Sequence, residues 1–435
     1  MIGAIIGDIV GSRFEFDAGE KSREFELFAK GCSFTDDTVM TIAVAEALMN
    51  AGKEADEKTV KAELIRSMKK WGQAYPNAGY GARFIHWVLS DDPKPYGSYG
   101  NGSGMRVSPA GWLYDTIERT REVARWTAEV THNHPEGVKG AESVAAAIFM
   151  ARNGASKEEI KQYIVDEFGY DLTRTLDEIR PSYHHVEDCM RTMPEAFTCF
   201  LEAESYEETL RNVMYIGGDT DTLAAIAGAV AEAMWGIPVR IIIDAREFIP
   251  DDIDSVVQRF NGIVHSTGDK TENPYNNNQF IKTAIDRVNE TRRGEDMIMV
   301  LDVLMKRMDE NGEAPTPMVD VNNVITGLDP DKLVMGKDFT IGEEVRLRKD
   351  TVTDGEGREW FPLFTDDEEL DKKPMSPIRM NVPIRIILED GLNSDRVEGV
   401  VINPFGQPLQ IPKDILKIMF EVYNKKKVRG DEPRG

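Results

Sequence analysis

Apolar residues recur at helical spacing through the first 250 residues of the chain, and strand-like alternation is scarce there. The pattern predicts helices over Thr38–Asn50, Thr59–Trp71, Ala141–Arg152 and Ser205–Met214. Leu223–Trp235 is apolar almost all round, as expected of a helix that is buried on every side. We therefore expect residues 1–264 to form an all-α domain.

A second domain follows, because the pattern changes after a polar, turn-rich stretch at 265–282 that we interpret as a linker. The pattern over residues 283–424 predicts an α+β domain, and residues 425–435 are expected to form a charged, frayed tail. The elements expected in this domain are a helix around Met297–Met308, short strands at Asp338–Arg348, Glu359–Phe364, Val382–Leu388 and Gly399–Ile402, and an amphipathic helix over Pro412–Tyr423. The sequence thus predicts a multidomain protein, with a helical domain followed by a smaller α+β domain.

Charge and composition exclude some classes of function. The chain has 435 residues, with 76 acidic and 52 basic side chains, for a net charge of −24. This balance argues against a protein that binds polyanions in general, but it is compatible with a small phosphorylated ligand or with carboxylate-bound metals. Three cysteines without a CxxC pattern favour a reducing compartment. Without a signal-peptide pattern or a span-length apolar run, we expect a cytoplasmic protein.

Two clusters of aspartate and threonine stand at predicted helix starts, Phe34–Thr38 and Gly217–Thr222. Mg²⁺ and Mn²⁺ prefer carboxylate and hydroxyl oxygens, so two such turns facing each other would suit two metal ions. The alternative is that these residues only cap their helices. Phe364–Glu369 repeats nearly the same string without a second cluster in its domain, and there we expect a helix cap.

Two further loops are candidates for contact with a ligand. Gly97–Arg106 has four glycines in a short stretch, which lets backbone N–H groups approach a ligand, although a flexible turn is the alternative. His132 and His134 precede a helix, where one could touch a ligand and His134 could act as a cap. For His184 and His185, packing or surface roles are favoured over metal ligation.

The N-terminal segment has glycines at positions 3, 7 and 11, which form a smooth face for close helix packing. Asp8 and Glu15 are seven residues apart and would share one helix face if the helix continued that far. Glu15 would then reach a site from near the helix end.

Taken in order, Gly3–Glu15, Thr35–Thr38, Gly97–Arg106, Thr131-His132 and Gly217–Thr222 resemble the ADP-ribosylglycohydrolase family over about residues 1–240. The resemblance implies an all-helical fold with two Mg²⁺ ions, Mn²⁺ being possible. The metal ligands it implies are Thr35, Asp36, Asp37, Asp219, Asp221 and Thr222. The substrate-binding residues it implies are Gly81, Gly97, Ser98, Tyr99, Gly100, Asn101, Gly102, Met105 and His132.

The reaction implied by this resemblance is hydrolysis of the glycosidic bond at ribose C1″ of ADP-ribose attached to an acceptor. Glu15 is the candidate acid or base, with the metal-bound Asp36 as the rival. The expected partner is an ADP-ribosylated protein or a small molecule containing ADP-ribose, and a nucleic-acid acceptor stays open. The alternative function is a non-catalytic ADP-ribose sensor, or an immunity protein against an ADP-ribosylating toxin.

The second domain resembles the SseB-like N-terminal domain through Trp360–Thr365 and Gly399–Gly406. That family implies no chemistry for these residues, so a protein-interaction role is the default expectation. The alternative is that both segments are ordinary core strands with turns, since Asn403-Pro404 is a common turn dipeptide.

Overall fold

The computed structural model divides the chain into two compact units, Met1–Lys270 and Thr271–Gly435. It describes residues 1–265, 278–291, 294–309, 311–320, 347–372 and 378–430.

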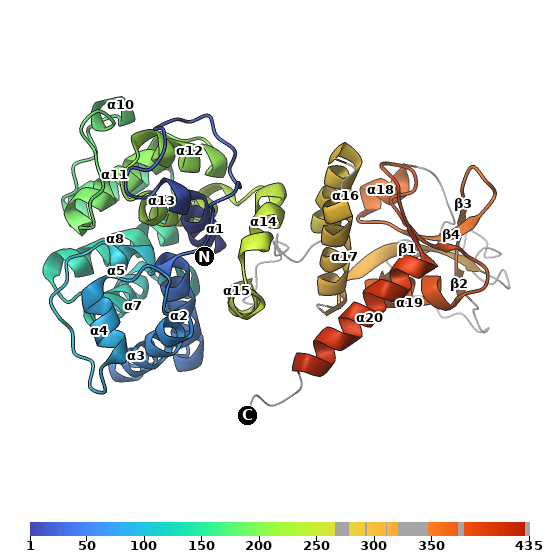
Figure 1. Cartoon of the computed structure of the whole chain (residues 1–435), viewed down its shortest axis with the longest axis horizontal. Helices are drawn as coiled ribbons and strands as arrows, with labels where there is room; N and C mark the ends of the chain where they lie inside the picture. The colour runs from blue at the N-terminus through green and yellow to red at the C-terminus, as the bar shows by residue number, and fades with distance from the viewer. Residues whose placement is uncertain (266–277, 292–293, 310, 321–346, 373–377, 431–435) are drawn as a thin grey trace, which may run out of the picture. The chain divides into compact units, whose positions relative to one another are not determined.

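The first unit is helical in the part of it that the structure describes (Figure 1). Its elements are α1 (Ile2–Gly11), the 3₁₀ turn η1 (Ser12–Phe14), α2 (Asp36–Ala51), α3 (Glu57–Ala74), α4 (Ala82–Leu89), α5 (Gly102–Met105), α6 (Ser108–Leu113), α7 (Ile117–Glu129), α8 (Pro135–Arg152), α9 (Lys157–Phe168), α10 (Leu176–Ile179), α11 (Cys189–Leu201), α12 (Tyr206–Ile216), α13 (Thr220–Trp235), α14 (Val239–Ala245), η2 (Arg246–Phe248) and α15 (Asp251–His265). The five helices predicted from the sequence in this region are all present, so the helical domain is confirmed.

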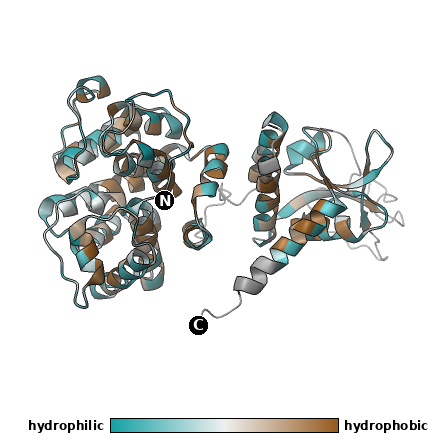
Figure 2. Cartoon of the chain, in the orientation of Figure 1, coloured by the Kyte–Doolittle hydropathy of each residue, from teal (hydrophilic) through white to brown (hydrophobic). Residues whose placement is uncertain are grey.

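Helices α1 and α13 form the centre of this unit. All residues of α1 and the residues of α13 from Thr220 to Glu232 are buried, and both helices are rich in apolar residues (Figure 2). A side chain at Gly7 would place its Cβ 2.1 Å from the Ala224 carbonyl oxygen, and one at Gly11 would lie 2.4 Å from the Thr220 oxygen. The predicted smooth glycine face is therefore confirmed, and it lets the two backbones touch.

This contact determines which residues meet. Thr220 Oγ1 donates a hydrogen bond of 2.8 Å to the Gly11 carbonyl, so the start of α13 lies beside the end of α1. Helix α2 packs against α1 and α3. The starts of α2 and α13 thus come together next to the same end of α1.

The second unit contains two small sheets and five helices in its described residues (Figure 1). Its elements are α16 (Gln279–Thr291), α17 (Gly294–Asp309), β1 (Glu313–Asp320), β2 (Leu347–Lys349), β3 (Val352–Thr353), β4 (Glu359–Leu363), α18 (Asp367–Asp371), β5 (Ile378–Pro383), α19 (Ile384–Asn393), β6 (Gly399–Ile402), β7 (Leu409–Pro412) and α20 (Lys413–Gly430). One sheet has the antiparallel order β2-β1-β5. The other has the order β3-β4-β6-β7, with β4 and β6 parallel.

Several predicted elements of this unit need correction. Only the first two residues of the predicted strand Val382–Leu388 belong to a strand, since β5 ends at Pro383. Helix α19 follows, because Ile384, Ile387 and Leu388 have helical spacing and are all buried. Of the predicted strand Asp338–Arg348, residues up to 346 lie outside the described residues, and only Leu347–Lys349 is observed as a strand.

The predicted linker and tail also differ from the structure. Helix α16 begins at Gln279, inside the stretch 265–282, whose residues 266–277 lie outside the described part. Helix α20 runs to Gly430, past residue 425 where the frayed tail was expected. Among the described residues, no helix combines the length and the hydropathy that crossing a membrane would need.

Candidate active site

The two predicted clusters of aspartate and threonine meet at one place in the first unit. Asp36 and Asp37 open α2, and Asp219 and Asp221 lie at the start of α13. Thr222 Oγ1 donates a hydrogen bond of 3.3 Å to Asp37 Oδ2, which links the two clusters directly. The structure therefore brings together residues that are far apart in the sequence.

Helix capping accounts for only part of these residues. Thr35 does cap α2, because its hydroxyl accepts a hydrogen bond of 3.3 Å from the Asp37 amide. Asp219 occupies the N-cap position of α13, but its side chain makes no capping hydrogen bond. Its Oδ2 instead accepts a hydrogen bond of 2.6 Å from Asn101 Nδ2, from the glycine-rich loop. The side chain of Asp219 is thus turned toward a cavity rather than toward its own helix.

Asp8 of α1 supports this cluster from within the core. It is fully buried and accepts hydrogen bonds from Thr35 N at 2.9 Å, from Thr35 Oγ1 at 2.8 Å and from Thr38 N at 3.0 Å. Ligand oxygens of Asp8, Asp37 and Asp221 lie within 4.8 Å of one another. Asp8 therefore holds the start of α2 in place, a role that its position in an apolar helix alone did not predict.

Buried like charges change the acidity of this cluster. Burial is the main cause that raises the pKa of Asp36, Asp37 and Asp221 well above its ordinary value, and neighbouring carboxylates add to it. Burial likewise raises the pKa of Asp219 to about 7. Asp37 Oδ1 is buried without a hydrogen-bond partner. Carboxylates packed this closely repel one another when ionised, and a divalent cation between them would offset that repulsion.

Glu15 reaches the cluster by a different route from the one expected. Helix α1 ends at Gly11 and is followed by η1, so Asp8 and Glu15 do not share a continuous helix face. Glu15 stands directly after η1, and the next two residues, Phe16 and Asp17, have positive φ values of 57° and 56°. Burial, followed by the charge of Asp221, raises the pKa of Glu15 to about 7.

A cavity of about 360 Å³ opens over these carboxylates. The predicted site residues that line it are Glu15, Asp36, Asp37, Gly81, Ser98, Gly100, Asn101, Gly102, Met105, His132, Asp219, Asp221 and Thr222. Three predicted residues do not line it. Thr35 is held by Asp8, the Gly97 amide donates to Asn133 Oδ1 at 2.7 Å, and Tyr99 is 49% exposed against the ring of His134.

His132 has a ring orientation that its neighbours impose. Arg106, which is fully buried, donates to Thr131 Oγ1 at 2.7 Å, and that hydroxyl lies 2.7 Å from His132 Nδ1. The hydrogen bond between Thr131 Oγ1 and His132 Nδ1 fixes the orientation of the ring and leaves Nε2 directed toward the glycine-rich loop. Burial, with Arg106 nearby, lowers the pKa of His132 well below its ordinary value. A neutral imidazole therefore lies beside Gly102, whose added Cβ would lie 3.3 Å from Nε2.

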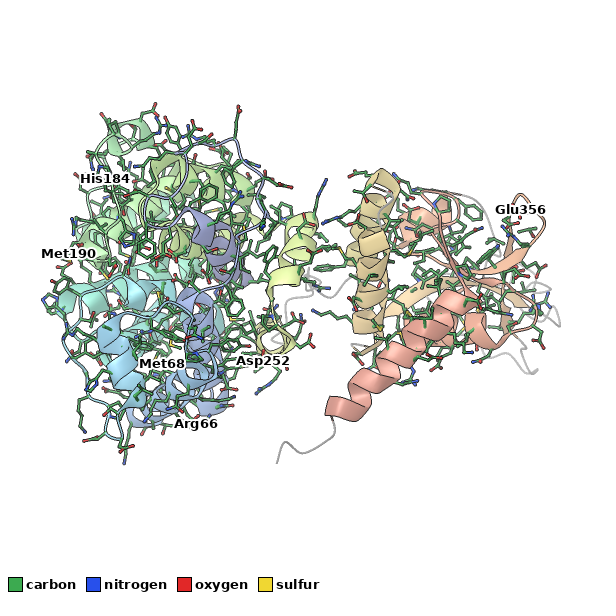
Figure 3. The ribbon with its side chains drawn as sticks, viewed as in Figure 1. Arg66, Met68, His184, Met190, Asp252 and Glu356 are labelled. Carbon is green, nitrogen blue, oxygen red and sulfur yellow. The ribbon has the colours of Figure 1, made fainter. Side chains whose placement is uncertain are left out.

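The other histidines have distinct positions. His134 caps α8 by accepting a hydrogen bond of 3.2 Å from the Glu136 amide, as one sequence interpretation expected. The side chain of His184 is 72% exposed (Figure 3). His185 lines the cavity together with Phe16 and Glu187. The ring of His185 also packs against Phe16, in agreement with the packing role that the sequence favoured. Its place at the cavity was not predicted, because no local pattern marks which of two adjacent histidines turns inward.

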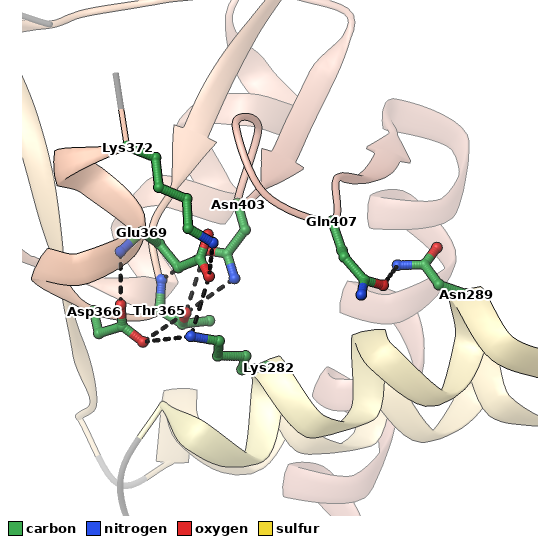
Figure 4. Close-up of polar contacts among 8 residues, drawn as sticks. All are labelled: Lys282, Asn289, Thr365, Asp366, Glu369, Lys372, Asn403 and Gln407. Carbon is green, nitrogen blue, oxygen red and sulfur yellow. Dashed lines mark hydrogen bonds and ion pairs between the residues drawn. The ribbon is translucent and has the colours of Figure 1, made fainter. Parts of the chain in front are cut away.

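The comparable string in the second unit is a helix cap. Asp366 Oδ1 accepts a hydrogen bond of 2.8 Å from the Glu369 amide, and Thr365 N donates to Asn403 Oδ1 at 3.0 Å (Figure 4). Lys282 and Lys372 lie 3.1 Å and 2.6 Å from Glu369 Oε1. The expectation of a cap at this position is confirmed.

A family model described as ADP-ribosylglycohydrolase matches residues 1–270, which is more than half of the chain. The chain belongs to the ADP-ribosylglycohydrolase family. Similar curated proteins include the human "ADP-ribosylhydrolase ARH3", 27% identical over 54% of this chain and 84% of that protein. The "ADP-ribosylarginine hydrolase Tri1" of Pseudomonas putida (strain GB-1) is also 27% identical, over 54% of this chain and 70% of that protein. A solved chain titled "ADP-ribosylglycohydrolase-related protein complex" aligns over 60% of this chain and 95% of that chain, with a TM-score of 0.46 and 23% identity.

The region that the family model matches contains every residue that lines the cavity. Several of those residues were not singled out in the sequence, among them Phe16, Arg83 and Glu187, and His185 was assigned a packing or surface role. Arg83 and Phe16 flank residues that had been singled out, Gly81 and Glu15, so proximity to a motif was the available signal. Glu187 comes from the loop before α11, and only the fold brings it to the cavity.

Proposed function

We propose that this protein is a dinuclear-metal-dependent hydrolase that cleaves the glycosidic bond at ribose C1″ of ADP-ribose attached to an acceptor. The observation that carries the proposal is that two aspartate clusters meet at the wall of one cavity. A hydrogen bond from Thr222 to Asp37 links the two clusters. Membership of the ADP-ribosylglycohydrolase family supports the kind of bond that is cut.

The residues present fit a pair of hard cations. The proposed ligands are Thr35, Asp36, Asp37, Asp219, Asp221 and Thr222. Asp37 Oδ1 is buried and has no hydrogen-bond partner, which is unfavourable unless a cation lies beside it. Mg²⁺ suits this oxygen-rich set, and Mn²⁺ accepts the same ligands. When bound, such ions polarise ribose hydroxyls and lower the pKa of a coordinated water.

The protein groups around the ions have separate tasks in this proposal. Glu15 moves the proton at the reacting centre, because a carboxyl whose pKa is about 7 exchanges protons readily near neutral pH. Asp36 is the rival for this role. Transition states of glycoside cleavage carry positive charge on the sugar, which the surrounding carboxylates stabilise.

The glycine-rich loop is assigned to the diphosphate and the distal ribose. Gly100 and Gly102 lie at the cavity without side chains, so a ligand can approach the backbone closely. The neutral imidazole of His132 lies at the same wall, where Nε2 is available for a hydrogen bond to the ligand. Recognition through such donors explains how a protein with a net charge of −24 can hold a dianion without a basic patch.

A panel of ADP-ribosylated substrates of defined linkage tests the proposal. Arginine-linked, serine-linked and nucleic-acid-linked ADP-ribose would each be incubated with the full chain in Mg²⁺, in Mn²⁺ and in EDTA. The name of the Pseudomonas putida relative makes the arginine linkage the first to include. We expect metal-dependent release of ADP-ribose from at least one linkage. Tight ADP-ribose binding by calorimetry, with no release from any linkage, would instead favour a sensor.

A further inference from the structure

His185 stands at the cavity wall beside two carboxylates. One ligand atom each of Glu15, His185 and Asp219 lie within 4.8 Å of one another. Octahedral ligands at about 2.1 Å from an ion are separated by about 3 to 4.2 Å, so small side-chain movements would bring the three groups to one ion. Among the described residues, this is the one such group that includes a nitrogen ligand.

The hydrogen bonds of the imidazole leave one nitrogen open. Nε2 lies 3.1 Å from Glu187 Oε1, whereas Nδ1 is buried and has no hydrogen-bond partner. Metal-binding histidines commonly donate one ring N–H to a carboxylate while the other nitrogen coordinates the ion. Glu187 occupies the place of that carboxylate.

The position of the ring is fixed from two sides. The His185 amide donates to Asp17 Oδ2 at 3.2 Å, and the ring packs against Phe16 with centroids 4.7 Å apart. On the other side, the Asn101 amide donates to the Glu187 carbonyl at 2.9 Å, which ties this loop to the glycine-rich loop. Packing on Phe16 alone would leave the buried Nδ1 without a partner, so packing does not account for this residue.

We propose that His185 is a further metal ligand, which binds through Nδ1 the ion shared with Asp219 and Glu15. The inference rests on the proposed function, since it concerns one of the two ions named there. Imidazole nitrogen favours borderline cations over Mg²⁺, so this position prefers Mn²⁺.

Pulsed electron paramagnetic resonance tests the ligand without relying on turnover. The full chain would be stripped with EDTA and loaded with substoichiometric Mn²⁺, with Mg²⁺ filling the remaining positions. A directly bound imidazole produces nitrogen-14 modulation of the Mn²⁺ echo. We expect that modulation in the unsubstituted chain and in His184→Gln, and its loss in His185→Gln. His132→Gln, which changes the other cavity histidine, should keep it.

Calorimetric titration gives a second readout. His185→Gln should weaken Mn²⁺ binding by about tenfold to a hundredfold and change Mg²⁺ binding much less. His185→Phe, which keeps a ring against Phe16, should show the same loss and so separates coordination from packing. Circular dichroism would establish that these variants are folded.

The outcomes separate this inference from the proposed function. Nitrogen modulation that is missing from the unsubstituted chain, or that survives in His185→Gln, overturns the assignment of His185 while leaving metal-dependent hydrolysis intact. Failure of the unsubstituted chain to bind either ion overturns both. Equal Mn²⁺ affinity in the unsubstituted chain and in His185→Phe also overturns the assignment.

Discussion

Phe34–Asp37 and Phe364–Asp367 have the same four residues, and each string leads into a helix. In the first unit, α1 and α13 bring Asp8 and Asp221 against the string, so that buried carboxylates face one another. In the second unit, the neighbours of the string are the side-chain amide of Asn403 and the ammonium group of Lys282. The comparison teaches that partner elements, and not the string itself, decide whether such residues form a site.

The largest contrast should come from matched alanine substitutions at the fourth position of each string. Asp37→Ala removes a buried proposed metal ligand, and we expect hydrolysis to fall by more than about 100-fold, since loss of an outer-shell partner alone costs up to that much. Asp367→Ala changes a side chain that is 78% exposed and should leave hydrolysis unchanged. Rates of ADP-ribose release and metal titration of both variants check this. Equal rates would contradict the proposed site.

Metal removal should destabilise the first unit and leave the string of the second unit unaffected. Burial raises the pKa of Glu15 and of Asp219 to about 7, so the folded state binds more protons than the unfolded state between about pH 4 and 7. The free energy of unfolding of the metal-free first unit should therefore fall as pH rises through this window. Saturation with Mg²⁺ at 100 times its Kd should add about 2.7 kcal/mol.

Hydrogen exchange measured by mass spectrometry resolves the two units in this experiment. Peptides from α2 and α13 should gain protection with Mg²⁺, while those from β4 and α18 should not change. Asp37→Asn, which removes one buried charge, should raise the stability of the metal-free first unit and abolish the Mg²⁺ effect. A metal-free first unit that is more stable at pH 8 than at pH 5 would contradict the repulsion among these carboxylates.

A smaller effect is expected from Asp8, which touches the string of the first unit without belonging to it. Asp8→Asn keeps the shape but exchanges an acceptor oxygen for a donor, so it disturbs the hydrogen bonds that Thr35 and Thr38 donate. We expect about a tenfold loss of metal affinity, with the cavity retained. Thr38→Ser, which keeps the hydroxyl, serves as the control. Unchanged metal affinity in Asp8→Asn would show that α2 holds its start by itself.

The smallest effect should come from the helix cap of the second unit. Asp366→Ala removes the acceptor for the Glu369 amide and should cost about 1 kcal/mol of local stability. Increased hydrogen exchange in α18 checks this, and Asp366→Asn should retain most of the protection. Hydrolysis should stay at the unsubstituted rate. A loss of hydrolysis in Asp366→Ala would mean that the second string has a role beyond capping.

The local sequence pattern was sufficient to predict much of the secondary structure of the first unit. Helical spacing predicted α2, α3, α8, α12 and α13, because an amphipathic or wholly apolar period is a property of consecutive residues. The glycines at 3, 7 and 11 predicted a close helix contact for the same reason. The prediction failed at Val382–Leu388, where a proline preceded a short apolar run that suits a strand or a helix equally well.

The sequence by itself determined which residues can ligate a cation, since carboxylate and hydroxyl chemistry belongs to the residue type. Only the tertiary structure decided that Asp8 supports Thr35, that Glu15 follows a 3₁₀ turn instead of extending α1, and that His185 turns inward while His184 does not. Those outcomes depend on contacts between segments far apart in the chain. Burial raises the pKa of Asp37, and this burial exists only once the helices have packed.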